Sequence, residues 1–263
     1  MNYKKTYTPK KGYTKLCEKD NCTCKRLEFG MIELGSGDSV TLTTEGNEYA
    51  FVFLTGSADV KLGENDWKAV GGRKDVFEGP GHTVYAPRNS QVTFTGCDDV
   101  KIAVISTPTD KDSQPQWIQP ENVKVMTLGE EPWKRGCNII VDGDSKADYL
   151  TIGESMVVPG NWAGFPGHKH DVDNMPQESV AEEIYYFLFD KEQGFGFQSL
   201  YTRDGEIDET YRVKNNDLVE FPKGYHLTMT APGYQMYILW FMAGDEQGIH
   251  RTNDPDHEWV LQK

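Results

Sequence analysis

The chain of 263 residues has no long apolar run. No stretch approaches the roughly 18 consecutive apolar residues of a membrane-spanning helix, and the basic segment at residues 1–13 lacks the apolar region of a secretion signal. Long runs of helix-forming residues are also scarce, whereas aromatic residues make up 12% and glycine (26) and proline (13) are frequent. This composition favours short strands joined by tight turns. We therefore expect a soluble, cytoplasmic, all-β protein.

Positive charge is in short supply. The 27 lysines and arginines are outnumbered by 41 aspartates and glutamates, which gives a formal net charge of −14. Such a field repels phosphate backbones and anionic lipid surfaces, so the sequence argues against a nucleic-acid or membrane partner. It does not exclude an anionic small molecule, because a few local cations are enough to line a pocket.

The sequence also lacks a disulfide framework. It has five cysteines, an odd number, and Cys97 and Cys137 stand alone. Cys17, Cys22 and Cys24 are clustered as C-x4-C-x-C, but no second Cys/His pair follows at zinc-finger spacing. We expect free thiols and a solvated loop around the cluster rather than a structural zinc site.

Short apolar alternations cut by turn residues fill two long stretches of the chain. Period-2 patterns run from residue 27 to 107 and again from 147 to 244. Between them, residues 107–123 are polar and carry three prolines without periodicity, as a linker does. Similar proline-containing turns at 85–94 and 220–229 hint at an internal duplication. The pattern predicts two β units of the sandwich or barrel type, at residues 1–118 and 119–263.

Four residues of the second unit have the chemistry of metal ligands. His168 and His170 are two residues apart, so on a strand both imidazoles share one face, roughly 7 Å apart. Glu183 opens an aromatic strand in which period 2 places it with Tyr185 and Phe187, and His226 follows a Pro-x-Gly turn. Three imidazoles and one carboxylate suit a transition metal with open positions for water or substrate. Glu182, on the opposite face of that strand, is the competing carboxylate.

The order HxH, glutamate before an aromatic strand, and P-x-G-x-H resembles the two-part metal motif of the cupin superfamily. A twelve-residue insert at 171–182 separates the second histidine from the glutamate. Together with GNW at 160–162, QGFGFQSLYT at 193–202, DPDHEW at 254–259 and GGRKDVFEGP at 71–80, this insert resembles the 5-deoxy-glucuronate isomerase family over nearly the whole chain. The segments at 17–25 and 135–149 depart from the family pattern.

The resemblance implies two cupin barrels, each a double-stranded β-helix or jelly roll. One divalent ion, zinc, iron or manganese, would sit in the C-terminal barrel on His168, His170, Glu183 and His226. The N-terminal barrel would hold no metal, since it has no HxH pair and His82 alone cannot make a site. The oligomeric state stays open, and a homo-oligomer is compatible with the family.

The activity that the resemblance implies is a metal-dependent aldose–ketose isomerisation of a sugar acid. The family converts 5-deoxy-D-glucuronate into 2-deoxy-5-keto-D-gluconate in myo-inositol degradation. The competing interpretations are a hexuronate ketol-isomerase, an iron-dependent cupin dioxygenase and a cupin that binds sugar acids without turnover.

Several side chains are candidates for the acid/base group and for binding the substrate carboxylate. The acid/base candidates are Tyr185, Tyr201, Tyr225, Glu182 and His257. The cations for the carboxylate are Lys169, Arg203 and Arg251, with Arg212 and Lys223 as further choices, and arginine is the better suited to bidentate pairing.

Overall fold

The computed structural model describes residues 2–262 and is built almost entirely of antiparallel β-sheet. Within this described part the only helical segments are two 3-10 turns, η1 (Pro120–Asn122) and η2 (Glu258–Leu261). The prediction of an all-β protein is therefore confirmed. None of the described segments forms a helix long and apolar enough to cross a membrane.

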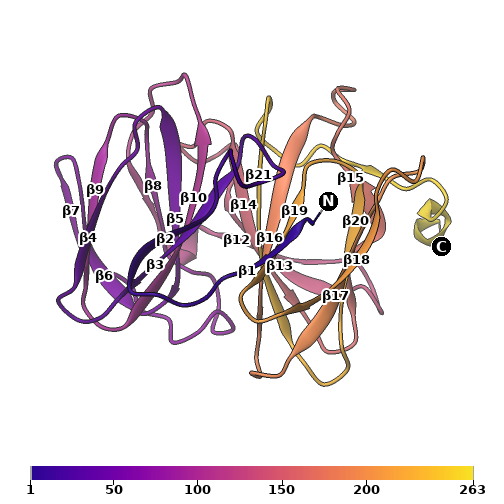
Figure 1. The fold of residues 1–263 in the computed structure, drawn as a ribbon, viewed down its shortest axis with the longest axis horizontal. Helices are drawn as coiled ribbons and strands as arrows, with labels where there is room; N and C mark the ends of the chain where they lie inside the picture. The colour runs from indigo at the N-terminus through magenta and orange to yellow at the C-terminus, as the bar shows by residue number, and fades with distance from the viewer. Residues whose placement is uncertain (1, 263) are drawn as a thin grey trace.

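The N-terminal half contains a six-stranded and a four-stranded sheet (Figure 1). The larger has the order β11 (Gln116–Ile118), β8 (Thr83–Ala86), β5 (Asn47–Thr55), β10 (Val100–Pro108), β3 (Glu28–Leu34), β2 (Gly12–Cys17). The smaller has the order β4 (Ser39–Thr43), β9 (Gln91–Gly96), β6 (Ser57–Leu62), β7 (Asn65–Gly71).

The C-terminal half contains a seven-stranded and a five-stranded sheet. The larger has the order β1 (Lys4–Thr6), β19 (Asp217–Phe221), β16 (Ala181–Phe189), β21 (Met236–Gly244), β14 (Leu150–Val157), β13 (Arg135–Val141), β12 (Lys124–Leu128). The smaller has the order β18 (Asp208–Lys214), β17 (Phe195–Tyr201), β20 (Tyr225–Thr230), β15 (Trp162–Lys169), β22 (Thr252–Asn253).

The two halves repeat the same strand topology. In each larger sheet four consecutive strands have the same order, β8-β5-β10-β3 in one and β19-β16-β21-β14 in the other. The smaller sheets match in the same way, β4-β9-β6-β7 against β15-β20-β17-β18. Both turns singled out in the sequence lead from the larger sheet to the smaller one, β8 to β9 and β19 to β20. This recurrence supports the duplication that the sequence only hinted at.

Three apolar layers hold the four sheets together. One fills the N-terminal sandwich, one fills the C-terminal sandwich, and the third lies between the two larger sheets. In that third layer the ring of Phe29 on β3 packs 5.5 Å from Tyr186 on β16 and 5.2 Å from Phe241 on β21, measured between centroids. Because the larger sheets are buried on both faces, their central strands are continuously apolar rather than alternating.

Strand β16 shows how period 2 assigns side chains to these layers. Tyr185 and Phe187 belong to the interior of the C-terminal sandwich, whereas Ile184 and Tyr186 belong to the layer between the two halves. The predicted division of this strand into two faces is therefore confirmed. It directs Glu183, which shares the face of Tyr185, into the C-terminal sandwich.

A buried ion pair also joins the two halves. The guanidinium of Arg73 donates to Glu154 on β14 at 2.7 Å, and both side chains are almost completely buried. Glu154 also accepts hydrogen bonds from the hydroxyl of Tyr237 at 2.9 Å and the amide of Asn138 at 3.1 Å. A buried carboxylate with three donors is satisfied, so the pair fixes how the halves meet.

The cysteine cluster is not a solvated loop, and that prediction was wrong. Cys17, Cys22 and Cys24 are at most 4% exposed. All five cysteines carry free thiols. The loop packs on the C-terminal half, where Glu182 accepts the backbone N–H groups of Lys25 and Arg26 at 2.8 and 2.7 Å. Its partners are more than 150 residues away in the chain, so local spacing could not reveal the burial.

The segment Lys4–Thr6 crosses to the C-terminal half, where it pairs with β19 at the edge of the seven-stranded sheet (Figure 1). It therefore departs from the predicted division of the chain. With the exception of this strand, we propose that residues 1–118 and 119–263 form the two structural units, because η1 at Pro120–Asn122 separates their sheets.

Candidate active site

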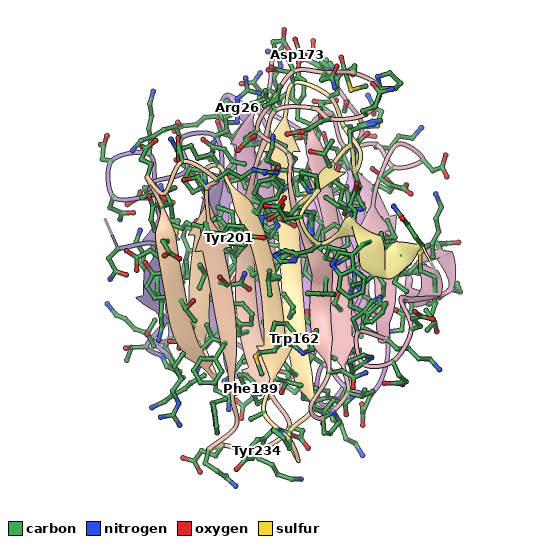
Figure 2. The ribbon with its side chains drawn as sticks, turned by 90° about the vertical axis from the view of Figure 1, so that its right-hand side faces the viewer. Arg26, Trp162, Asp173, Phe189, Tyr201 and Tyr234 are labelled. Carbon is green, nitrogen blue, oxygen red and sulfur yellow. The ribbon has the colours of Figure 1, made fainter. Side chains whose placement is uncertain are left out.

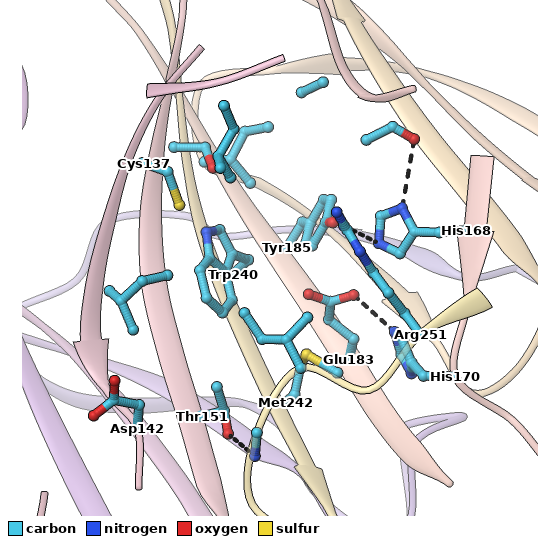
Figure 3. Close-up of a pocket in the computed structure, with 18 of the residues that line it drawn as sticks. Cys137, Asp142, Thr151, His168, His170, Glu183, Tyr185, Trp240, Met242 and Arg251 are labelled. Atoms are coloured by element: carbon cyan, nitrogen blue, oxygen red, sulfur yellow. Dashed lines mark hydrogen bonds and ion pairs between the residues drawn. The ribbon is translucent and has the colours of Figure 1, made fainter. Parts of the chain in front are cut away.

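Three strands of the C-terminal sandwich bring the predicted metal ligands together (Figure 3). His168 near the end of β15 pairs in register with His226 on β20, and His170 follows directly after β15. Glu183 reaches them from β16 in the opposing sheet. The ligand atoms of His168, Glu183 and His226 lie within 4.8 Å of one another, and the fourth residue, His170, has Nε2 3.0 Å from Glu183 Oε2. All four side chains are buried.

Backbone carbonyls orient the three imidazoles for coordination. Nδ1 of His170 lies 2.7 Å from the carbonyl oxygen of Ala181, Nδ1 of His226 lies 3.2 Å from that of Gly224, and Nδ1 of His168 lies 3.4 Å from that of Gly164. A ring nitrogen next to a carbonyl oxygen carries a proton, so Nε2 is the nitrogen that each ring can offer to a metal ion. This is the arrangement in which protein histidines bind metal ions.

Nε2 of His226 has no hydrogen-bond partner although it is completely buried. It lies 2.9 Å from Glu183 Oε2, close enough for an ion pair, but without the angle of a hydrogen bond. Two acceptors that face each other in a buried site need a cation between them. The donor set and this orphaned nitrogen therefore fit a divalent metal ion.

The electrostatics of the cluster keep its carboxylate charged. Burial alone would raise the pKa of Glu183, but the hydrogen bond from His170 and the attraction of His170 and His226 outweigh it and lower the pKa to about 2. Burial and the positive charge of Arg251 depress the pKa of His168. Neutral imidazoles and an ionised carboxylate are the protonation states that bind metal.

The cluster opens onto a cavity of about 680 Å³ in the C-terminal sandwich. Tyr185 and Trp240 form part of its wall, together with Cys137 on β13 (Figure 3). The hydroxyl of Tyr185 makes no hydrogen bond to another described residue, and burial raises its pKa well above the usual value. This volume is in the range of pockets that bind small molecules.

Two arginines line the same cavity. Arg251 is exposed along much of its length, yet its Nη1 reaches to 3.3 Å from Nε2 of His168. Arg135 on β13 is only 8% exposed, and burial together with the charge of Arg251 lowers its pKa. Among the described residues neither guanidinium has a carboxylate within ion-pairing distance. Two uncompensated cations in a cavity provide a binding site for an anionic group.

Arg135 was missed by sequence reasoning. The signal was present, because Arg135, Cys137 and Ile139 alternate along one strand and all three line the cavity. An arginine in an otherwise apolar period-2 series is buried with its neighbours, and a buried charge needs a partner or a ligand.

Three predicted residues lie outside the cavity. Lys169 stands between His168 and His170, and its ammonium pairs with Asp171 at 2.5 Å and Glu178 at 2.7 Å, which fastens the long insert. Tyr225 precedes His226, and its ring stacks on Tyr201 with centroids 5.6 Å apart. The register pairs Tyr201 with Tyr225, so both point to the same side. None of the three lines the cavity.

Arg203, His257 and Glu182 also lie away from the cavity. Arg203 is exposed and faces Asp256 at 3.3 Å. His257 is exposed just before η2, and its ring centroid is 6.5 Å from that of Phe165. Glu182 caps the cysteine loop as described above. Of the predicted acid/base and carboxylate-binding residues, the structure therefore brings Tyr185 and Arg251 to the metal-ligand cluster.

The long insert between His170 and Glu183 lies at the end of the C-terminal sandwich where the cysteine loop also lies. Figure 2 shows Asp173 of the insert and Arg26 of the loop at one end of the molecule, with Phe189 and Tyr234 at the other. Glu178 holds the insert by accepting the N–H groups of Asp171 and Val172 at 2.8 and 3.0 Å.

Comparison with known proteins agrees with this picture over nearly the whole chain. The model of the KduI/IolB family matches residues 3–260. The 5-deoxy-glucuronate isomerase of Bacillus subtilis subsp. natto is 37% identical over 239 residues, which are 90% of this chain and 88% of that protein. The protein of the same name from Geobacillus kaustophilus is 38% identical and covers 89% and 85% of the two chains.

Solved structures give the same result. An IolB-like protein from Salmonella typhimurium LT2 superposes with a TM-score of 0.95 at 32% identity, covering 99% of this chain and all of that one. The oxalate decarboxylase of Lactobacillus farciminis, 10% identical, superposes with a TM-score of 0.68 over all of this chain and 91% of the other, which shows a shared fold alone. The predicted fold of two cupin barrels is confirmed. The chain is thus a member of the KduI/IolB family.

Proposed function

We propose that this protein is a metal-dependent 5-deoxy-glucuronate isomerase that converts 5-deoxy-D-glucuronate into 2-deoxy-5-keto-D-gluconate. The observation that carries the proposal is a cluster of three histidines and one glutamate next to two unpaired arginines in one cavity. The relatives that bear this name cover most of the chain. We assign the reaction to myo-inositol degradation in the cytoplasm, with a small sugar acid as the partner.

His168, His170, Glu183 and His226 would hold one divalent ion, for which zinc, iron and manganese suit the donor set. An ion bound there would supply Lewis acidity, which polarises a carbonyl group and stabilises negative charge on its oxygen. The carbonyl contacts at the three Nδ1 atoms hold the imidazoles in place before any ion arrives, so little ordering is left for binding.

Arg135 and Arg251 bind the substrate carboxylate. Their charges have no acid partner among the described residues, and guanidinium groups pair well with carboxylates. Since Arg251 contacts His168, the carboxylate end of the substrate lies within reach of the metal ligands. This pairing orients the open-chain sugar with its carbonyl toward the cluster.

Tyr185 is the hydrogen-bond donor of the cavity. Its hydroxyl has no partner among the described residues, and the raised pKa keeps it protonated at neutral pH. It therefore donates a hydrogen bond to the oxygen of the substrate on which charge develops. Trp240 supplies apolar wall that keeps water from the reacting atoms.

The experiment is anaerobic turnover of metal-analysed protein with 5-deoxy-D-glucuronate, followed by NMR for formation of the ketone. Wild-type protein is expected to form 2-deoxy-5-keto-D-gluconate without oxygen, His168→Ala to lose both metal and activity, and the matched control His257→Ala to keep both. Bound metal without product in wild type contradicts the proposal. A requirement for oxygen assigns the cavity to a dioxygenase, and turnover only of a pectin-derived hexulosuronate assigns it to a ketol-isomerase.

A further inference from the structure

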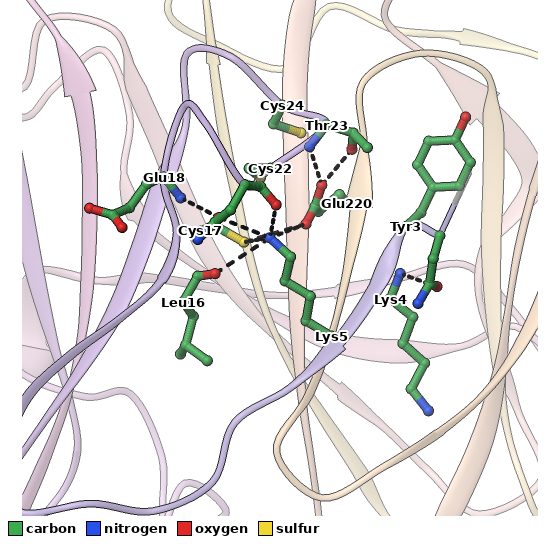
Figure 4. A network of polar contacts seen from close by, with 12 residues as sticks. Tyr3, Lys4, Lys5, Leu16, Cys17, Glu18, Cys22, Thr23, Cys24 and Glu220 are labelled. Carbon is green, nitrogen blue, oxygen red and sulfur yellow. Dashed lines mark hydrogen bonds and ion pairs between the residues drawn. The ribbon is translucent and has the colours of Figure 1, made fainter.

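A second cluster of metal-binding side chains lies outside the cavity. Cys17 ends β2, Cys22 and Cys24 belong to the loop that follows, and Glu220 belongs to β19 in the other half (Figure 4). The ligand atoms of Cys17, Cys22 and Glu220 lie within 4.8 Å of one another, and Sγ of Cys17 is 3.5 Å from Glu220 Oε1. The thiol of Cys24 lies beside that of Cys22.

We propose that Cys17, Cys22 and Glu220 bind a structural zinc ion, separate from the metal centre of the barrel, and that the neighbouring thiol of Cys24 turns from the carbonyl of Glu183 to complete the four ligands. Zn²⁺ takes four ligands in a tetrahedron, and thiolates with one carboxylate are among its preferred donors. The four side chains are at most 4% exposed, which is typical of closed structural sites and leaves no position for a substrate.

Hydrogen bonds hold the carboxylate ready for this role. Oε2 of Glu220 accepts the backbone N–H of Thr23 at 2.6 Å and its hydroxyl at 2.5 Å, which leaves Oε1 facing the cysteines. Oriented carboxylates with one oxygen fixed by such bonds are typical of metal sites. Glu220 is thus already immobilised by Thr23, which belongs to the loop that the zinc ion would hold in place.

Lys5 supplies the positive charge that such a site needs. Its ammonium lies 3.1 Å from Glu220 Oε1 and 3.7 Å from Sγ of Cys17. It is anchored by the carbonyl oxygen of Asn21 at 2.5 Å. A zinc ion with thiolates and a carboxylate carries excess negative charge, so a neighbouring cation stabilises it in a buried position.

An ion can enter the cluster from solvent, and once bound it would attach the cysteine loop to the C-terminal half. A surface cavity of about 520 Å³ is lined by Cys22, Thr23 and Glu220, so an ion reaches the ligands from solvent. The thiol of Cys24 points at the backbone oxygen of Glu183 at 3.6 Å. An ion here would fasten the loop of the N-terminal half to the back of the two strands β16 and β19, one of which carries a ligand of the barrel.

The test uses full-length protein loaded with Co²⁺ in place of zinc. Cobalt bound to thiolates gives a charge-transfer absorption that the barrel centre, with nitrogen and oxygen donors, cannot give. Wild type is expected to show this absorption and to hold one ion more than the barrel accommodates. Cys22→Ser is expected to lose both signals, whereas the control Cys97→Ser, which changes an exposed cysteine outside the cluster, is expected to keep them.

The same experiment separates this site from the barrel. The double variant His168→Ala, His226→Ala is expected to lose the barrel ion and to retain the thiolate absorption. Folded wild type that binds cobalt without that absorption overturns the proposal. So does a thiol titration of denatured, unreduced protein that finds fewer than the five free cysteines, because a disulfide would then hold the loop. If Cys22→Ser fails to fold, chelator-dependent exposure of wild-type thiols to a thiol reagent decides instead.

Discussion

The guanidinium of Arg251 donates to Nε2 of His168 at 3.3 Å, and both residues line the cavity. That lone pair is also the one a metal ion would need, so ion and arginine compete for it. Arg251 is exposed and has no acid partner among the described residues, which leaves it free to turn away. A metal ion held by His168 would therefore leave the guanidinium of Arg251 free for the substrate carboxylate.

We expect Arg251→Met and Arg135→Met each to raise KM for 5-deoxy-D-glucuronate about 10- to 100-fold, because each removes a charge-assisted hydrogen bond to the carboxylate. Metal content should stay at the wild-type level. Steady-state kinetics and metal analysis check this, with Arg203→Met as the control that leaves KM unchanged, since Arg203 faces Asp256 outside the cavity. Wild-type KM in both cavity variants would assign the carboxylate to another cation.

Tyr185→Phe removes one hydroxyl and keeps the ring that packs 4.8 Å from Phe221 and 5.7 Å from His226. The proposed hydrogen bond to the developing oxyanion predicts a fall in kcat of about 10²- to 10³-fold with little change in KM. Unfolding temperature and metal content should match wild type. Tyr201→Phe serves as the matched control. Full activity of Tyr185→Phe would show that this tyrosine only fills the barrel core.

Metal removal should reverse the dependence of stability on pH. In the metal-free protein burial lowers the pKa of His170, but Glu183 outweighs it and raises the pKa above 6.5. The stabilisation from the protonated pair is thus fully present below pH 6.5 and lost as pH rises through the raised value. An ion displaces that proton, so metal affinity rises over the same range.

The check is the free energy of unfolding in urea between pH 5.5 and about 8.5, with and without one equivalent of metal. The metal-free protein should become less stable toward high pH, and the increment from metal should grow. His170→Ala, which removes the titrating group, should flatten the metal-free curve. Parallel curves for loaded and metal-free wild type would contradict the assignment of His170 as a ligand.

Arg73→Met should destabilise the protein by about 3–5 kcal/mol, because it leaves the buried carboxylate of Glu154 without its cation. The double variant Arg73→Met, Glu154→Gln is expected to recover part of this loss. Arg88→Met, which breaks an exposed pair with Asp112, should leave stability nearly unchanged. Chemical denaturation checks all three, and equal losses in Arg73→Met and Arg88→Met would refute the role of the pair between the halves.

Much of the site could be predicted from the alternation of side chains along strands and from the order of the motifs in the sequence. The alternation along β16 placed Glu183 and Tyr185 on one face, and the order HxH, glutamate, histidine put four ligands in one barrel. The same alternation also excludes Lys169 and Tyr225 from the cavity, since each directly neighbours a ligand histidine on its strand. Their selection rested on nearness in the sequence, whereas neighbours on a strand point to opposite faces.

The remainder depends on contacts between distant segments. The cysteine cluster reads as a polar loop because its partners, Glu182 and Glu220, come more than 150 residues later. Similarly, the role of Arg135 in ligand binding can be recognised only once the fold places β13 and Arg251 around the same cavity. Local patterns define strands and faces, but which faces meet is decided by packing of the whole chain.

The pairing of β1 with β19 constrains how this chain is completed during synthesis. The hydroxyl of Thr6 donates to Asp217 at 2.6 Å, a partner 211 positions later. The ribosome has therefore made most of the chain before Lys4–Thr6 finds its place, and the edge of the sheet that carries Glu183 stays open until then. An open edge recruits strands from other chains. Until Lys4–Thr6 docks, β19 is therefore the strand of this sheet that is open to pairing with another chain.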